Sequence, residues 1–157
     1  MQPARPNRPL SLCIQKLLLD QIFPGAVCRI LRRRLTWEGF IQPSAVGHRY
    51  KIRLVYDLGL PPDVFLLEPD PRILADTVRP GRILPHNYGG TPLKLCLYLP
   101  GSGEWKSSQP LATTILPWMS MWLAFFEDWL VTDVWSGGGI HPNVKEPEKP
   151  GSGEKRH

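Results

Sequence analysis

The sequence predicts an α+β fold in which an N-terminal helix, an antiparallel β-meander and a long C-terminal helix share one core. Two observations lead to this prediction. Apolar residues recur at helical spacing near each end of the 157-residue chain. Between these regions, apolar and polar residues alternate with the period of two that is typical of half-buried strands. A chain of this length favours a single domain and can bury a substantial core without disulfides.

The first 22 residues divide into a polar segment and a helix. Residues 1–9 are polar and rich in proline, which predicts disorder. The apolar spacing predicts a helix over 9–22, which ends at Pro24-Gly25. Cys13 falls on the apolar stripe of this helix and is expected to lie in the core. The stripe consists of Leu10, Cys13, Ile14, Leu17 and Leu18.

Three segments have the pattern of strands. Residues 28–41 are expected to hold one, and residues 48–57 alternate most clearly. A turn at Pro61-Pro62 leads to a third short strand over 64–67. Short connections between successive strands indicate an antiparallel meander. The buried candidates are Leu31, Leu35 and Trp37 in the first segment, and Tyr50, Ile52, Leu54 and Tyr56 in the second.

The remaining chain consists of a long connection, a helix and a tail. Residues 70–95 are interrupted by proline and glycine and are expected to be mostly irregular, which in a compact domain favours a functional segment. A helix that packs on the sheet is expected to begin after Thr113 or Thr114. The composition predicts a domain over 10–143 and a flexible tail over 144–157. The apolar face of the helix consists of Met119, Trp122, Leu123, Phe126, Trp129 and Leu130.

Composition and charge exclude several classes of protein. Cys13, Cys28 and Cys96 have neither disulfide nor metal-ligand spacing, which indicates reduced thiols in a cytoplasmic protein without a metal or cofactor. No signal peptide opens the sequence, and the apolar stretch 111–126 is too short to span a bilayer. The net charge is +5, but no basic stripe interleaved with aromatic residues is present. Nucleic-acid binding is therefore not expected as the main role.

Cys96 is the candidate nucleophile. It lies in an apolar run, with His86 and Asn87 nine to ten residues before it. A reactive thiol needs an exposed rim, which glycine-rich backbone can leave, and the amide of Asn87 can stabilise a tetrahedral oxyanion. The pattern predicts acyl transfer through a cysteine thioester, while the plainer interpretation is an inert core cysteine. The flanking glycines are Gly89, Gly90, Gly101 and Gly103.

Other side chains are expected to shape this site. His86 is expected to hold the loop through hydrogen bonds rather than to act as a base, and Tyr88 and Trp105 are expected to wall the site. Lys94 would share a face with Cys96 in a regular strand, where it either lowers the pKa of the thiol or is solvated. His141 is a candidate proton acceptor if the chain folds back beside the thiol, and otherwise a surface residue.

The order of these motifs resembles the ubiquitin-conjugating (UBC-like) family over about residues 8–132. Pro61-Pro62 precedes the third strand, as in that family. Pro85-His86-Asn87 is a permuted form of the family's His-Pro-Asn triplet, and Asn87 precedes Cys96 by nine residues (96 − 87). Trp105 then precedes the next helix. The resemblance implies a UBC-like fold with an active-site loop that carries Cys96.

The chain is similar in particular to ubiquitin-conjugating-like proteins of bacterial anti-phage operons, the CBASS defence systems. The resemblance rests on residues 95–98, on Glu127-Asp128, and on 135–139 followed by His141-Pro142. It implies the stand-alone type, which holds the C-terminus of a cGAS-like cyclic oligonucleotide synthase as a thioester on Cys96. Transfer to a lysine would regulate anti-phage signalling. An activating-type partner is a further possibility.

Three other functions are compatible with the same residues. A thiol hydrolase would use Cys96 and His141 to cut the C-terminal tail of the synthase. A non-catalytic binding module would keep the fold without the chemistry. A basic nucleic-acid module would bind with steep salt dependence and would not need Cys96. The basic run 32–34 motivates the hypothesis that this face docks the synthase.

Overall fold

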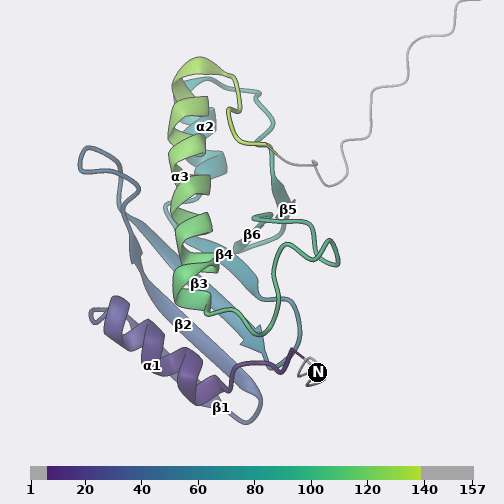
Figure 1. The fold of residues 1–157 in the computed structure, drawn as a ribbon. Coiled ribbons are helices and arrows are strands. Elements are labelled where there is room, and N and C mark those ends of the chain that lie inside the picture. Colours follow the sequence, from purple (N-terminus) through teal and green to yellow (C-terminus); the bar gives the residue numbers. More distant parts are fainter. Residues whose placement is uncertain (1–6, 139–157) are drawn as a thin grey trace, which may run out of the picture.

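Six antiparallel strands form one sheet in the structure, which is a computed structural model that describes residues 7–138. The strand order is β1-β2-β3-β4-β6-β5. Helix α3 crosses one face of the sheet, and α1 lies beside β1 and β2 (Figure 1). The strands are β1 (Val27–Leu31), β2 (Arg34–Ile41), β3 (Tyr50–Asp57), β4 (Asp63–Glu68), β5 (Asn87–Gly89) and β6 (Leu93–Leu95). The helices are α1 (Leu12–Ile22), α2 (Pro71–Val78), the 3₁₀ turn η1 (Leu111–Thr113) and α3 (Ile115–Thr132).

The core lies between the sheet and α3. The inward side chains of β3 have at most 1% of their surface exposed, as the alternating pattern predicts. The ring of Tyr50 on β3 lies 6.3 Å from that of Phe126 on α3, in an edge-to-face contact. The predicted mixed α+β architecture, with its N-terminal helix, meander and C-terminal helix on the sheet, is therefore confirmed. The inward residues of β3 are Tyr50, Ile52, Leu54 and Tyr56.

The segment 28–41 forms two strands where one was expected. Arg32 and Arg33 make the turn between β1 and β2, and Arg32 has a φ of 56°. Such turns usually carry glycine or asparagine, so two arginines gave no turn signal. Leu31 lies beside this turn and is 74% exposed, which contradicts its predicted burial. Leu35 and Trp37 are buried as predicted.

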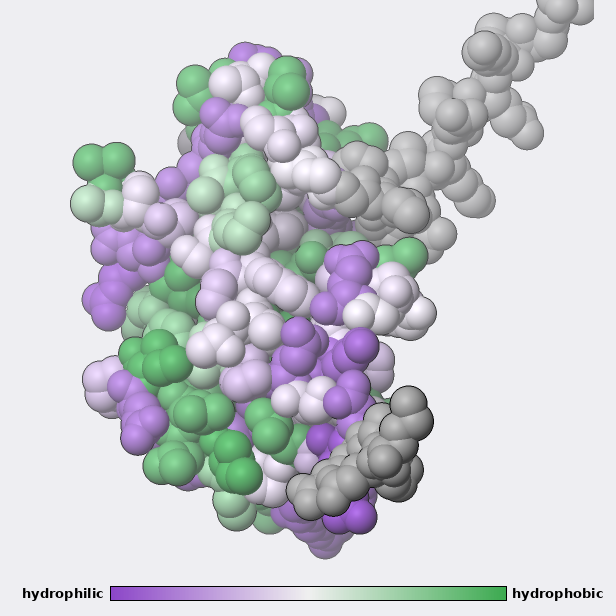
Figure 2. Space-filling model, viewed as in Figure 1, coloured by the Kyte–Doolittle hydropathy of each residue, from purple (hydrophilic) through white to green (hydrophobic). Residues whose placement is uncertain are grey.

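Helix α1 buries a different face from the one predicted. Gln15 is fully buried, because its amide oxygen accepts a hydrogen bond from the Leu111 N–H (2.9 Å) and its amide nitrogen donates to the Gln109 carbonyl (3.0 Å). A polar residue thus takes a core position at little cost. Cys13 is exposed, contrary to the prediction, and hydrophobic surface gathers over α1 (Figure 2). Ile14, Leu17 and Ile22 are 46%, 56% and 48% exposed.

The segment 70–95 is more regular than the sequence predicts. It contains α2, β5 and β6. The side chain of Asp70 caps α2 by accepting a hydrogen bond from the Arg72 N–H (2.9 Å), and Pro71 occupies the first turn, where a missing N–H costs nothing. This proline therefore marks a helix start. Strands of three residues are too short to show a periodic pattern.

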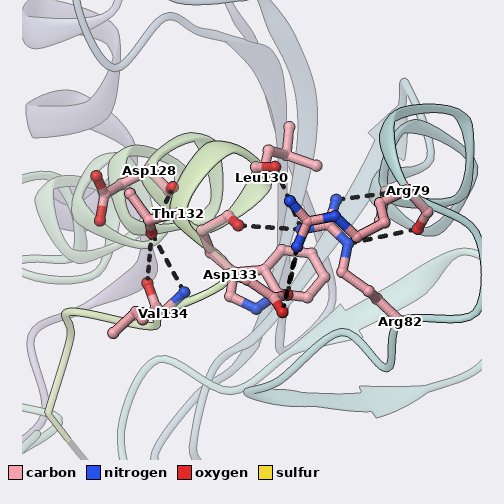
Figure 3. A network of polar contacts seen from close by, with 9 residues as sticks. Arg79, Arg82, Asp128, Leu130, Thr132, Asp133 and Val134 are labelled. Carbon is pink, nitrogen blue, oxygen red and sulfur yellow. Dashed lines mark hydrogen bonds and ion pairs between the residues drawn. The ribbon is translucent and has the colours of Figure 1, made fainter.

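A buried arginine ties the end of α3 to the chain that leads to the candidate site. Arg82 donates to the carbonyls of Trp129 and Leu130, each at 3.2 Å, and its guanidinium lies 4.4 Å over the Trp129 ring (Figure 3). It also donates to the Ala75 carbonyl of α2 at 3.3 Å. Arg82 therefore gives the Leu130 carbonyl a donor at the end of α3, adds a second donor to the Trp129 and Ala75 carbonyls, and fixes the segment just before His86.

Candidate active site

Cys96 follows β6 directly and is held by its backbone. Its N–H donates to the His86 carbonyl at 3.1 Å, and the indole N–H of Trp122 on α3 donates to the same oxygen at 3.0 Å. His86 has a φ of 53°, a conformation that residues other than glycine rarely adopt. The thiol contacts the Tyr98 carbonyl at 3.7 Å, and Cys96 is 8% exposed. The His86 carbonyl therefore pairs with the backbone of Cys96 and links it to α3.

A cavity of about 510 Å³ lies beside the thiol, and Cys96 and His86 both form part of its wall. Most of the wall is apolar, and Glu104 is the one carboxylate among the lining residues of the described chain. Such a volume is in the range of known ligand sites. The other lining residues are Leu97, Tyr98, Leu99, Trp118, Met121, Trp122, Phe125, Trp135 and Gly138.

Tyr88 lies close enough to Cys96 for the two side chains to interact. Burial is the main cause that raises the pKa of Tyr88 to about 12, and the nearby Cys96 side chain adds to the shift. The phenol therefore keeps its proton at neutral pH and can act as a hydrogen-bond donor. Tyr88 lines a smaller cavity of about 160 Å³, which also borders Pro61 and Pro62.

Lys94 is paired with a carboxylate in the structure. Its ammonium lies 2.8 Å from Asp63 Oδ1 and 5.3 Å from the centre of the Tyr88 ring. The side chains of Lys94 and Asp63 are 38% and 44% exposed, so water weakens this ion pair. Lys94 thus forms part of the wall of the smaller cavity, and the carboxylate of Asp63 partly neutralises its charge.

The amide of Asn87 is engaged in its own loop. Its nitrogen donates to the Leu84 carbonyl at 2.7 Å, and its oxygen accepts from the Gly89 N–H at 3.0 Å. These bonds shape the turn into β5, where Asn87 pairs with Leu95 next to the thiol. The nitrogen also donates to the Pro85 carbonyl at 3.4 Å, so the amide donates to its own loop in this conformation and would have to turn to reach an oxyanion at Cys96.

Trp105, which was expected to wall the site, lies away from both cavities. Trp105 packs edge-to-face on Tyr56, with ring centres 5.6 Å apart, and donates to the Thr114 hydroxyl at 3.1 Å. It is not among the residues that line either cavity, and it supports the start of α3 instead. His141 lies outside the described residues, and Gly138, three positions before it, lines the larger cavity.

Sequence reasoning missed the aromatic side of the cavity. Trp118 and Phe125 lie on α3 next to its predicted core face, and Trp135 follows the helix. Residues 118, 122 and 125 are spaced as on one side of a helix, so the sequence could have predicted a second apolar face on α3. Rings pack in series here: Trp135 lies 5.1 Å from His86 and 5.4 Å from Trp122.

Neither a metal site nor a membrane span is found in the part of the chain that the structure describes. Within residues 7–138, no three His, Cys, Asp or Glu side chains gather so that they could hold a metal ion. In the same range, none of the helices combines the length and the apolar character needed to cross a bilayer.

The fold and the site define a mixed α+β protein with a cysteine in the wall of an aromatic cavity. A family model described as "Type II CBASS E2 protein" matches residues 15–142, most of the chain. The protein therefore belongs to the Type II CBASS E2 family. This match confirms the resemblance to E2-like proteins of CBASS and indicates a role in CBASS conjugation together with other proteins of the operon. No curated protein matches the sequence.

Proposed function

We propose that this protein is a ubiquitin-conjugating-like transferase that carries the C-terminus of a partner protein as a thioester on Cys96. The partner is the cGAS-like cyclic oligonucleotide synthase of the same system, and the acyl group passes to a lysine. The observation that supports this proposal is the position of Cys96 in the wall of a large cavity, within a chain of the CBASS E2 family.

The chemistry has two steps. In the first, the Cys96 thiolate attacks an activated carbonyl carbon at the partner's C-terminus, the new C–S bond forms and the activating group leaves. A free carboxylate is not reactive enough for this step, so an ATP-dependent activating-type partner supplies the acyl adenylate or thioester. In the second step, a neutral lysine amine attacks the thioester, and Cys96 leaves as the thiolate.

Several side chains have proposed roles in these steps. Tyr88 donates a hydrogen bond to the sulfur, since its phenol is neutral and close to Cys96. Asn87 donates to the oxyanion once its amide turns from the Leu84 carbonyl. His141 accepts the proton of the attacking amine. It follows Gly138 by three residues, a span of up to roughly 10 Å, and Gly138 borders the cavity.

The test is an adduct assay with the purified operon proteins. The protein is mixed with its synthase and other operon neighbours, then analysed by non-reducing gel and intact mass spectrometry. An adduct on Cys96 that carries the partner's C-terminus and is cleaved by hydroxylamine supports the proposal. Cys96→Ala removes this adduct, whereas Cys13→Ala, which changes an exposed thiol, keeps it.

Other outcomes separate the alternatives. A cleaved synthase tail without a lysine conjugate indicates a thiol hydrolase, because water then takes the place of the amine. Tight binding of the synthase without any adduct indicates a non-catalytic binding module. An adduct that survives in Cys96→Ala contradicts the assignment of the nucleophile.

A further inference from the structure

The cavity beside Cys96 is built mainly from aromatic rings. Tyr98 lies two residues after Cys96, Trp118 and Phe125 belong to α3, and Trp135 follows that helix. Two rim residues leave much apolar surface in solvent: Met121 is 54% exposed and Leu99 is 45% exposed. An apolar concave surface of this size marks a place where another molecule binds.

The molecule that occupies the cavity has to be one that is bound to Cys96 or reacts with it. Because Cys96 is part of the cavity wall, an acyl group on its sulfur begins at the cavity. Three extended residues span roughly 10 Å, so the last residues of a carried tail lie over or inside this space. We propose that the cavity binds one bulky apolar side chain, aromatic or leucine-like, from the last three residues of the tail. This inference rests on the proposed function.

The charge of the wall supports this choice of side chain. The lining residues of the described chain include no lysine or arginine, so an acidic side chain finds no counter-ion there. Glu104 lies at the wall and accepts a hydrogen bond from Ser102 at 3.2 Å. A cationic side chain is the main competitor, because aromatic faces and a carboxylate can both attract it. The rest of the wall is mostly apolar, so burial of an apolar side chain in the cavity is favourable.

Small peptide thioesters test the inference without any activating partner. The probes are acetyl-Xaa-Gly thioesters of 2-mercaptoethanesulfonate, with Trp, Leu, Ala or Lys at Xaa. The Cys96 thiolate attacks the thioester carbon, the C–S bond to the small thiol breaks, and that thiol leaves as a thiolate. Intact mass spectrometry follows the rate of loading, with Cys96→Ala as the blank.

The expected result is that the Trp and Leu probes load at least tenfold faster than the Ala probe, equivalent to about 1.4 kcal/mol. Equal rates for all probes overturn the inference and leave the thioester function standing. Fastest loading of the Lys probe, lost in Glu104→Gln, overturns it in favour of a cationic side chain. An absence of loading on Cys96 overturns both the inference and the proposed function.

A matched pair of variants locates the preference in the cavity. Met121→Trp places a large ring at the exposed rim, so the ratio of Trp-probe to Ala-probe rates is expected to fall to about one. Val131→Trp adds the same ring to the same helix at a position that is 78% exposed and does not line the cavity. It is expected to keep the wild-type ratio. An unchanged ratio in Met121→Trp overturns the inference.

Discussion

Trp122 donates its indole N–H to the carbonyl oxygen of His86 across 3.0 Å, and this bond connects α3 to the candidate site. The same oxygen accepts the N–H of Cys96 at 3.1 Å. One buried carbonyl therefore joins the long helix, the loop before β5 and Cys96. The position of the thiol depends on how α3 sits on the sheet.

Trp122→Phe removes this indole donor and is expected to lower the free energy of unfolding by about 1–2 kcal/mol. Because the Cys96 loop loses its bond to α3, iodoacetamide is expected to label Cys96 severalfold faster. Trp37→Phe is the control, since the indole nitrogen of Trp37 is buried and has no hydrogen-bond partner in the described chain. Equal Cys96 labelling rates in the two variants would show that the indole bond does not position the thiol.

Asn87 allows the two steps of the proposed reaction to be separated. Asn87→Ala is expected to slow transfer from Cys96 to lysine more than it slows thioester formation, because an oxyanion donor acts on attack at the thioester. Single-turnover rates of loading and of discharge to free lysine measure the two effects. Asn87→Asp keeps an oxygen for the Gly89 N–H and loses the donor to Leu84. Equal losses in both steps would mean that Asn87 only shapes the loop.

Arg82 is expected to contribute more to stability than its neighbour Arg79. Arg82→Ala leaves the Leu130 carbonyl without its donor and removes the contact with the Trp129 ring, whereas the Trp129 and Ala75 carbonyls keep the N–H groups of Asp133 and Arg79. These losses predict a fall of about 1–3 kcal/mol in the free energy of unfolding, measured in urea. Arg82→Lys is expected to restore only part of this, since one ammonium does not reproduce the planar guanidinium. Arg79→Ala removes an exposed ion pair and is expected to cost less than about 1 kcal/mol. Similar losses at both positions would contradict this ranking.

The elements of the fold that could be predicted are those in which the spacing of apolar residues in the sequence matches the residues that are buried. β3 alternates along its whole length, and five of the six predicted face residues of α3 are buried. The hairpin at Arg32 and the face of α1 were not predictable, because each depends on a contact distant in sequence or on an unusual turn. Gln15 is buried because Gln109, just before η1, and Leu111, at its start, offer backbone groups 94 and 96 positions away.

The sequence predicted which residues lie next to Cys96 along the backbone better than it predicted the side chains that surround the thiol. Cys96, His86 and Asn87 do lie together, because β5 and β6 pair directly beside the thiol. Trp105 was assigned to the wall on its distance along the chain, whereas the fold places it against Tyr56. The aromatic cavity depends on which side of α3 faces the loop after Cys96. Sequence spacing alone does not fix that orientation.

The three cysteines are expected to differ in their reaction with iodoacetamide at pH 8. Cys13 is exposed and is expected to react readily. Cys28 is expected to react last, because burial, the main cause, and the nearby Asp20 carboxylate raise the pKa of its thiol to about 11. Only about one molecule in a thousand then carries the Cys28 thiolate. Peptide mass spectrometry of partly labelled protein gives the order, and early labelling of Cys28 would contradict it.

The raised pKa of Cys28 also predicts how stability changes with pH. The folded state holds the thiol proton more tightly than the unfolded chain, whose thiol ionises near pH 9. The contribution of the protonated Cys28 thiol to the free energy of unfolding is therefore complete below about pH 9 and is lost as the pH rises towards 11. Cys28→Val removes the titrating group from a buried position. Between pH 8 and pH 10.5, the free energy of unfolding measured in urea should fall more for the wild type than for Cys28→Val. Equal falls in the two proteins would contradict the raised pKa of Cys28. Buried tyrosines titrate in both proteins, so their effect cancels in the comparison.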